Sequence, residues 1–477
     1  MATANPMNLT FALLPLTALL VAPLAAPVLA ENVPTNIALR DAQGREIVPG
    51  GYVVITEDGK GPIHYTPDDY RRMVRMGANF QVIRTTLGRL GGWPGKEGDP
   101  SYPAQLDAMV RMGKDAGLQT IFKLVIYDIR PFGSAQWDAI YQNTDGTQDA
   151  LVAAWSKLWN RYQHEPSVFG YDLLNEPQRG LDPDEERCCR EQLLPTLRRL
   201  ADAMHAVCPG QWALYQPLFR QTGAGDGPFL PIREPFGRDR VIYAPHLYSM
   251  DLAMINPMLD RYLREAALSK APLLLGEWGP ATDLAADTDP KKQKRYTQVY
   301  QATANALDQR GLGGIKAWFC GTRAPLQSKK RPNPFTWAIF SDTDPVGHRE
   351  RKYITDVLAR PRPLAVAGHL ERHGFDFATR TLQVSLQPDA QRASTEIFVP
   401  AERFYPEGFR VEVGSGLTLA LKPAAAKLST LNASDQTRRD QAKRVHWDAG
   451  SQHLVIEKWI VKSPSLTLHI SPLPKRP

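Results

Sequence analysis

Two glutamates at the ends of apolar runs have the residue type and placement that acid–base chemistry requires. Glu176 closes the run VFGYDLLNE (168–176), and Glu277 lies in APLLLGEWG (271–279). If both runs are strands of one parallel barrel, their carboxyl ends meet at the same mouth. Two facing carboxyl groups can cleave a glycosidic bond: one donates a proton to the leaving oxygen, and the other attacks the anomeric carbon or activates water. The pair therefore predicts hydrolysis of glycosides.

Other side chains that suit a sugar site fall at the ends of further runs. They are Arg84, Asn175, His246, Tyr248 and Trp318. His246 and Tyr248 are two positions apart, so both project to the same face of a strand. The Asn175 amide can bond the sugar 2-hydroxyl, and Trp318 can stack under the ring in the cleaved subsite. Each of these residues alone has a structural explanation, and their joint placement is what favours a site.

We expect the two glutamates to differ in environment. Arg84 and Tyr248 are expected to stabilise the charge of Glu277, which keeps that carboxylate ionised and nucleophilic. Glu176 is expected to be less well paired, with a raised pKa that makes it ready to donate a proton. Two carboxyl groups suffice for this chemistry, so we expect no metal and no organic cofactor.

Eight apolar runs alternate with amphipathic helical stretches between residues 50 and 321. The runs cover 52–55, 79–84, 118–127, 168–176, 212–219, 240–248, 271–279 and 314–321. Nearly continuous runs rich in Val, Ile and Leu are typical of strands buried on both faces. Eight such alternations over about 300 residues predict an α/β protein with a (β/α)8 barrel. An open doubly wound sheet is the alternative.

The pattern changes after residue 360, where Pro361 and Pro363 mark a boundary. Short alternating segments follow at 381–386, 394–400, 409–414, 417–422, 453–459 and 466–470. They predict a small antiparallel β-sandwich. We therefore expect a catalytic barrel over residues 31–360 and a sandwich over 361–477. The sandwich either packs against the barrel, which we favour, or contacts a substrate surface.

Residues 1–30 are apolar, are interrupted by prolines and end in small residues at Ala30. This pattern is typical of a secretory signal peptide, although the stretch before the apolar run contains no Lys or Arg. We expect cleavage near Ala30 and export to the periplasm or the outside of the cell. In an oxidising compartment, a disulfide among Cys188, Cys189 and Cys208 is expected.

The composition is that of an ordinary globular protein. The 477 residues are 43% hydrophobic and 22% charged, with a formal net charge of +7. The densest basic group is Arg438, Arg439, Lys443 and Arg444, which we interpret as a solvated loop or strand edge. No groove-reading motif accompanies it, so we expect no nucleic-acid partner. Weak, transient attraction to an anionic membrane surface remains open.

Three motifs resemble glycoside hydrolase family 5, in the order that family uses. They are YDLLNEP (171–177), APHLYS (244–249) and LLLGEWG (273–279). The resemblance implies a retaining double displacement on a (β/α)8 barrel, with Glu176 as acid/base and Glu277 as nucleophile. It also implies supporting positions, which match Arg84, Asn175, His246, Tyr248 and Trp318.

The C-terminal segments 360–386 and 394–414 look like the sandwich of endoglycoceramidases and related glycolipid hydrolases. Two departures stand out. The end of the third run, FKLVIYDIRP (122–131), lacks the histidine often found there, and Tyr127 or Asp128 could fill its space. An RPYP-like junction reads RPRP, with Arg362 in place of the aromatic residue.

We expect a substrate with an apolar aglycone, such as a glycolipid or a small glycoside. Besides the resemblance, apolar residues near predicted rim loops favour it: Phe132, Trp137, Phe219 and Phe229. An endo-β-glycanase acting on glucan or mannan is the second hypothesis, and release of a free lipid aglycone separates the two. A carbohydrate-binding barrel without catalysis is the third, since a barrel fold hosts many functions.

Overall fold

The computed structural model describes residues 33–58, 61–126, 133–219, 232–320, 337–341, 349–422, 427–460 and 463–474. The predicted signal peptide lies outside these residues, so its prediction stays a prediction. Tyr127, Asp128, Phe132 and Phe229 also lie outside them.

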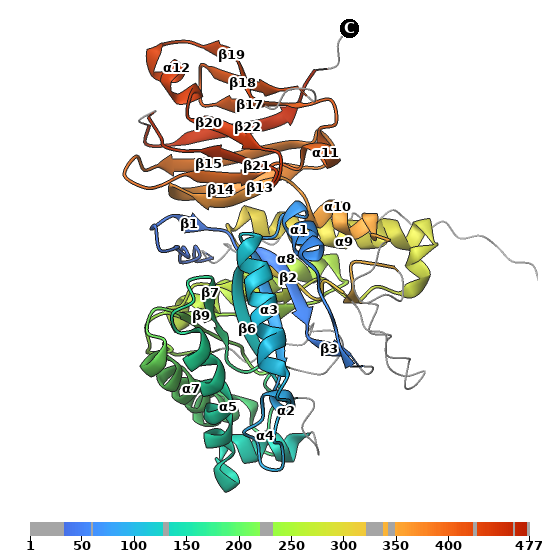
Figure 1. The fold of residues 1–477 in the computed structure, drawn as a ribbon, viewed down its shortest axis with the longest axis vertical. Coiled ribbons are helices and arrows are strands. Elements are labelled where there is room, and N and C mark those ends of the chain that lie inside the picture. Colours follow the sequence, from blue (N-terminus) through green and yellow to red (C-terminus); the bar gives the residue numbers. More distant parts are fainter. Residues whose placement is uncertain are drawn as a thin grey trace, which may run out of the picture. The chain divides into compact units, whose positions relative to one another are not determined.

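The eight predicted strands form a closed parallel barrel, drawn in Figure 1. They are β2 (Gly50–Ile55), β5 (Phe80–Thr86), β6 (Gln119–Val125), β7 (Val168–Asp172), β8 (Trp212–Tyr215), β9 (Val241–Tyr243) with β10 (His246–Leu247), β11 (Leu274–Trp278) and β12 (Gly313–Lys316). β9 and β10 are two pieces of one strand: β9 pairs with β8, and β10 pairs with β11. β12 pairs with β2 and closes the ring. The (β/α)8 prediction is confirmed, and the open sheet is excluded.

Helices follow the strands and cover their outer face. The longer ones are α1 (Pro67–Arg75), α3 (Tyr102–Asp115), α4 (Ser134–Tyr141), α5 (Thr147–Tyr162), α7 (Leu194–Val207), α8 (Leu252–Ser269), α9 (Pro290–Gln309) and α10 (Lys352–Leu358), and α2 (Leu87–Leu90) and α6 (Glu185–Cys188) are single turns. Figure 1 shows α3 beside β6, with which it is in contact. α1 begins where the sequence predicts, because Thr66 and Asp69 form a capping box ahead of Pro67.

Alternation along the strands fills the barrel with apolar side chains. The interior cluster contains Val53, Val82, Ile121, Leu214, Ile242, Leu274 and Ile315. Neighbouring strand positions, such as Ile83 and Phe122, belong to the larger core under the helices. On each strand, the residue two positions after the apolar interior residue also points inward and lies nearer the strand's carboxyl end. That residue is therefore the one that reaches the mouth of the barrel.

The C-terminal segment forms two antiparallel sheets around one apolar core. One sheet contains β1 (Glu46–Ile47), β13 (Arg362–Val366), β16 (Thr395–Phe398), β21 (His453–Ile456) and β20 (Val445–Asp448). The other contains β14 (Gly368–Asp376), β15 (Thr381–Pro388), β22 (Leu466–Pro472), β17 (Phe409–Val413), β18 (Leu417–Leu421) and β19 (Ser429–Ala433). The predicted sandwich is confirmed. β1 precedes the barrel in the sequence, yet it pairs with β13 of the sandwich.

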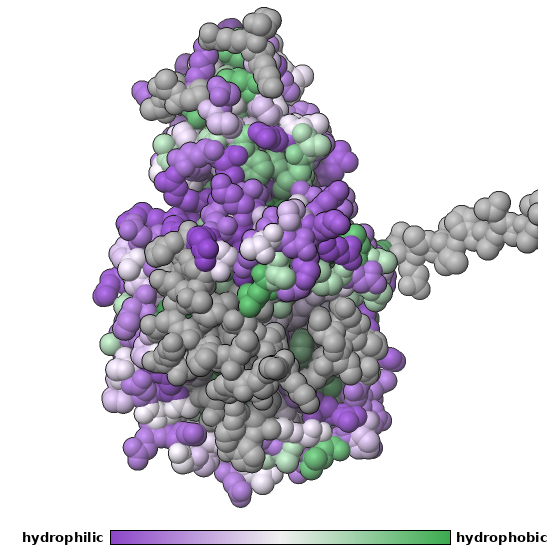
Figure 2. Space-filling view, turned by 90° about the vertical axis from the view of Figure 1, so that its right-hand side faces the viewer, coloured by the Kyte–Doolittle hydropathy of each residue, from purple (hydrophilic) through white to green (hydrophobic). Residues whose placement is uncertain are grey.

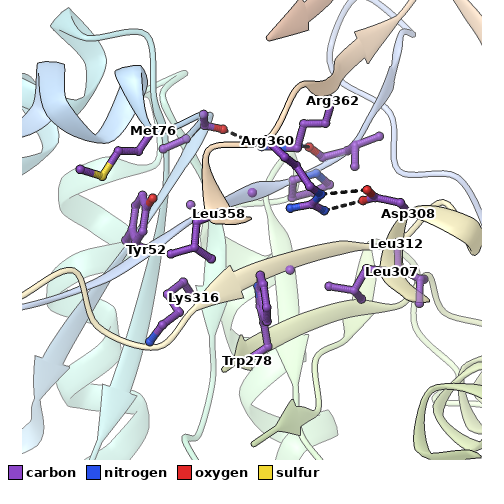
Figure 3. Close-up of a pocket in the computed structure, with 17 residues that line it drawn as sticks. Tyr52, Met76, Trp278, Leu307, Asp308, Leu312, Lys316, Leu358, Arg360 and Arg362 are labelled. Carbon is purple, nitrogen blue, oxygen red and sulfur yellow. Dashed lines mark hydrogen bonds and ion pairs between the residues drawn. The ribbon is translucent and has the colours of Figure 1, made fainter. Parts of the chain in front are cut away.

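Buried arginines connect the last helices of the barrel to the first strand of the sandwich (Figure 3). Arg360 donates hydrogen bonds of 2.8 and 2.5 Å to Asp308 of α9. Arg362 donates to the carbonyl oxygens of Val48 at 2.9 Å and Gly77 at 2.7 Å. The arginine of the RPRP junction therefore bonds backbone carbonyls of the barrel, which supports a packing role for the sandwich. The small pocket beside these residues lies at this junction, away from the mouth.

The predicted disulfide is wrong. Cys188, Cys189 and Cys208 are buried free thiols. The Cys208 thiol lies 3.5 Å from the carbonyl oxygen of Trp159. Burial raises the pKa of all three thiols, which disfavours the thiolate that disulfide exchange requires.

The basic group near the C-terminus divides between a helix, which carries Arg438 and Arg439, and the turn that leads to β20, which carries Lys443 and Arg444 as the loop interpretation expects. Arg438 and Arg439 belong to α12 (Gln436–Ala442), because Asp435 caps that helix by accepting a hydrogen bond from the Arg438 backbone N–H. Arg438 is also paired with Asp435 at 2.7 Å, and Lys443 with Asp440 at 2.9 Å. Local carboxylates thus offset much of this positive charge.

The described surface in Figure 2 is mostly hydrophilic, and its apolar residues form small separate patches. Within the described ranges, no helix combines the length and the apolar composition that crossing a membrane requires.

Candidate active site

A layer of polar side chains lies next to the apolar interior cluster of the barrel, on the side of the mouth. Arg84, Lys123, Asp172, Gln216 and His246 all occupy inward strand positions near the mouth. Arg84 and Lys123 come two residues after the interior Val82 and Ile121, and Gln216 comes two residues after Leu214. The strand period that packs the core therefore also places these groups at the mouth.

Glu277 reaches the interior because β11 is irregular. Leu274 is an interior residue, and strict alternation would direct Gly276 inward and Glu277 outward. The register of β11 against β12 shifts between Leu275 and Trp278, and such a bulge re-aims side chains. A side chain at Gly276 would lie only 2.7 Å from the carbonyl oxygen of Ala244. Glycine thus lets β11 approach the neighbouring strand while Glu277 turns toward the mouth.

Glu176 and Glu277 converge on one tyrosine. The Tyr248 hydroxyl donates a 2.6 Å hydrogen bond to Glu277 Oε2 and lies 3.5 Å from Glu176 Oε1. His246 Nδ1 is 2.9 Å from the same Glu176 oxygen. Glu176 has φ 48°, a left-handed conformation that costs a non-glycine residue roughly 1–2 kcal/mol. Its backbone N–H donates to Gln216 Oε1 at 2.9 Å, which helps to hold the strained turn.

Glu277 is buried and held in its charged form. Its Oε1 accepts a 2.8 Å hydrogen bond from Lys123 Nζ. Burial alone would raise the pKa of Glu277. The charge of Lys123, the field of His246 and the hydrogen bonds from Lys123 and Tyr248 overcome that effect and lower the pKa to about 2. The carboxylate is therefore ionised over the whole physiological pH range.

The cation beside Glu277 is not the one predicted. Tyr248 contacts Glu277 as expected, but Arg84 makes no ion pair with this glutamate in the described part of the chain. The Arg84 guanidinium instead lies 5.4 Å from the centre of the Trp318 ring. Lys123, the register partner of Arg84 on the neighbouring strand β6, is the cation that reaches Glu277.

Trp318, Asn175 and Phe219 lie around the carboxylate pair. Trp318 is half-buried and has φ 53°, and its ring centre is 6.5 Å from that of Trp337. Asn175 is buried, and its backbone N–H donates to the Leu124 carbonyl oxygen at 2.9 Å. The Phe219 ring lies 6.4 Å from the His246 ring.

Trp137 was counted among the apolar residues near the rim loops, and the structure places it in the core instead. Its side chain projects from α4, is fully buried and belongs to the main apolar core of the barrel. The indole therefore supports the position of α4, and it has no exposed surface to offer a ligand.

Sequence reasoning missed Lys123, Asp172 and Gln216. Lys123 Nζ is 3.4 Å from Asp172 Oδ2, and the Gln216 side-chain amide donates to the same oxygen at 2.8 Å. Each of the three is a polar residue at an inward-facing position of an otherwise apolar run. Such positions could have indicated the polar layer, because a polar side chain that points into a barrel needs a buried partner.

A closed (β/α)8 barrel with glutamates at the carboxyl ends of its fourth and seventh strands defines the class: barrel proteins that carry a carboxylate pair at the mouth. Two family models match the chain. The cellulase (glycosyl hydrolase family 5) model covers residues 64–316, and the glycoside hydrolase family 5 C-terminal domain model covers residues 360–456. Because the first covers more than half of the chain, the protein belongs to glycoside hydrolase family 5.

Several proteins similar to this chain are named endoglycoceramidase. The chain is 26% identical over 313 residues to endoglycoceramidase I of Rhodococcus hoagii. The matched region covers 61% of this chain and 56% of that protein. It is 25% identical over 297 residues to an endoglycoceramidase of Cyanea nozakii, with 59% and 54% covered. The chain thus matches little more than half the length of these relatives. The lactosyl-enzyme intermediate of endo-glycoceramidase II from Rhodococcus sp. shares the fold, with a TM-score of 0.66, 20% identity, and coverage of 92% of this chain and 100% of that one.

Proposed function

We propose that this protein is a retaining β-glycoside hydrolase that acts by double displacement. The observation that carries the proposal is the convergence of Glu176 and Glu277 on the Tyr248 hydroxyl, with Glu277 bonded to the Lys123 ammonium. One carboxyl group is thereby fixed as a permanent anion, and the other is half-buried and faces it. Retaining glycosidases require this division of roles across a short gap.

In the first step, ionised Glu277 attacks the anomeric carbon while Glu176 donates its proton to the leaving oxygen. A covalent glycosyl-enzyme forms, and the aglycone departs as an alcohol. In the second step, Glu176 removes a proton from water, which displaces Glu277 and restores the anomeric configuration. The hydrogen bond from Tyr248 holds the Glu277 oxygen that does not bond Lys123. Asn175 and Trp318 are proposed to bind the sugar 2-hydroxyl and ring face.

The proposed substrate is a glycolipid, or another glycoside with an apolar aglycone. Three findings support it: the relatives named endoglycoceramidase, the match to a family 5 C-terminal domain, and the Phe219 ring beside His246. Export after cleavage near Ala30 is part of the proposal, because the apolar, proline-interrupted residues 1–30 are typical of a signal peptide.

A transient membrane contact is also proposed. Four exposed aliphatic side chains follow strands at the mouth side of the barrel: Leu181, Leu252, Met254 and Leu284. Leu181 follows β7, Leu252 and Met254 begin α8, and Leu284 begins the short helix η3 (Leu284–Asp287) after β11. Side chains of this kind suit shallow contact with a lipid surface near the site.

Incubation with a panel of glycolipids and polysaccharides tests the substrate. We expect free lipid aglycone and a released sugar from β-linked glycosphingolipids in detergent, because the barrel mouth binds the sugar and leaves the aglycone outside. The products are measured by thin-layer chromatography and mass spectrometry, with the Glu277→Gly protein as the blank. Hydrolysis of β-glucan or mannan with intact glycolipids would instead identify an endo-glycanase. Binding without hydrolysis of any substrate would identify a carbohydrate-binding barrel.

A further inference from the structure

Lys123 occupies the centre of the polar layer, with acceptors on several sides. Its side chain is 1% exposed. Its ammonium lies 2.8 Å from Glu277 Oε1, 3.2 Å from His246 Nε2, 3.4 Å from Asp172 Oδ2 and 3.4 Å from the Gly276 carbonyl oxygen. Although burial opposes its charge, Glu277 and Asp172 raise the pKa of Lys123 above its ordinary value. The residue is therefore a fixed cation with only donors to offer.

The donors of this layer admit one consistent proton arrangement. An ammonium cannot accept a hydrogen bond, so His246 Nε2 must be the acceptor in its contact with Lys123. The single imidazole proton then resides on Nδ1, which is 2.9 Å from Glu176 Oε1 and 3.1 Å from the Tyr248 oxygen. Tyr248 directs its own proton to Glu277. Lys123, His246 and Tyr248 thus each direct a hydrogen-bond donor at a carboxylate.

We propose that Lys123 is a positioning residue that fixes the tautomer of His246 and thereby directs the Nδ1–H of the imidazole at Oε1 of Glu176. The same ammonium keeps Glu277 ionised. One lysine therefore prepares both carboxyl groups, a consequence that rests on the proposed function.

The contact with Lys123 is incompatible with a proton on His246 Nε2. An imidazolium would carry a proton on Nε2, directed at the ammonium 3.2 Å away, and that contact is repulsive. The charged and titratable groups around the imidazole are Lys123, Glu176, Glu277, Tyr248 and Asp172.

The tautomer is measurable in the wild-type protein by two-bond ¹H–¹⁵N correlation spectroscopy with ¹⁵N-labelled histidine. The His246 signals are assigned by their loss in a His246→Gln sample. We expect the Nδ1–H tautomer at pH 7, with Nε2 at the chemical shift of an unprotonated ring nitrogen. The Nε2–H tautomer, or an imidazolium at pH 7, would overturn the proposal. This measurement needs no turnover, so it stands even if the proposed hydrolysis fails.

Two variants connect the tautomer to function. In Lys123→Met, we expect the Nδ1–H tautomer to be no longer the single form, because the donor that requires Nε2 to accept is gone. We also expect a shift of the acid limb of kcat/KM to higher pH by about one pH unit or more, because loss of the cation raises the pKa of Glu277. A 2,4-dinitrophenyl β-glycoside isolates this limb, since its leaving group needs no acid. Asp172→Asn is the matched control, because Lys123 keeps its bonds to His246 and Glu277; we expect its tautomer to match wild type.

A Lys123→Met protein with the wild-type tautomer and acid limb would refute the role of this lysine. If that variant does not fold, the wild-type spectrum still tests the proposal, because an Nε2–H tautomer would overturn it. Absence of wild-type turnover on all glycosides would refute the proposed function and leave the tautomer result unaffected.

Discussion

Replacing Glu277 by glycine is expected to lower kcat for every glycoside by about 10⁵-fold or more, as loss of a covalent nucleophile does in other hydrolases. The loss should not depend on the leaving group, because without Glu277 no covalent glycosyl-enzyme can form. Initial rates with an aryl β-glycoside and with a glycolipid measure it.

Azide gives this prediction its specificity. The glycine variant leaves space beside the anomeric carbon, and azide entering there should restore turnover of an activated glycoside and yield a glycosyl azide of inverted configuration. Glu265→Gln is the matched control: Glu265 is also buried, but it bonds Arg261 and Tyr243 away from the mouth. We expect its activity to stay within several-fold of wild type, without an azide effect. Near-normal activity of Glu277→Gly would show that the nucleophile is assigned wrongly.

Replacing Glu176 by alanine is expected to have an effect that depends on the leaving group. A glycolipid has a poor leaving group and needs the proton from Glu176, so its cleavage should slow by about 10²–10⁴-fold. A dinitrophenolate leaves without protonation, so formation of the glycosyl-enzyme from its glycoside should slow far less. Pre-steady-state release of dinitrophenolate should then show a burst, since the second step lacks its base. Equal losses across leaving groups, with no burst, would argue against the acid/base role.

Much of the fold follows from hydrophobic pattern alone. The eight runs correspond to the barrel strands because both faces of each strand are buried, which leaves a continuous apolar signature. The sandwich segments follow because alternation marks a sheet with one buried face. The place of β1 in the sandwich could not be predicted. This strand has only two residues, which show no alternation, and it is far in the sequence from the other strands of the sandwich.

The site was only partly predictable, for two physical reasons. Alternation places Arg84 and Lys123 on the same interior face, but it does not tell which cation reaches Glu277. That choice depends on strand stagger and on the β11 irregularity, which is set by backbone packing at Gly276 rather than by a local sequence preference. The disulfide prediction failed similarly, because chain spacing does not report whether two thiols face each other.

The central claim is that Glu277 forms a bond to the sugar while Glu176 faces it across the cleavage site. Incubation with a 2-deoxy-2-fluoro glycoside carrying a good leaving group tests this most directly, since fluorine slows breakdown of the covalent intermediate. Intact-protein and peptide mass spectrometry should find one sugar per chain, attached at Glu277. A sugar attached to any other residue, or an unlabelled enzyme that turns over substrate with inversion, would contradict the account.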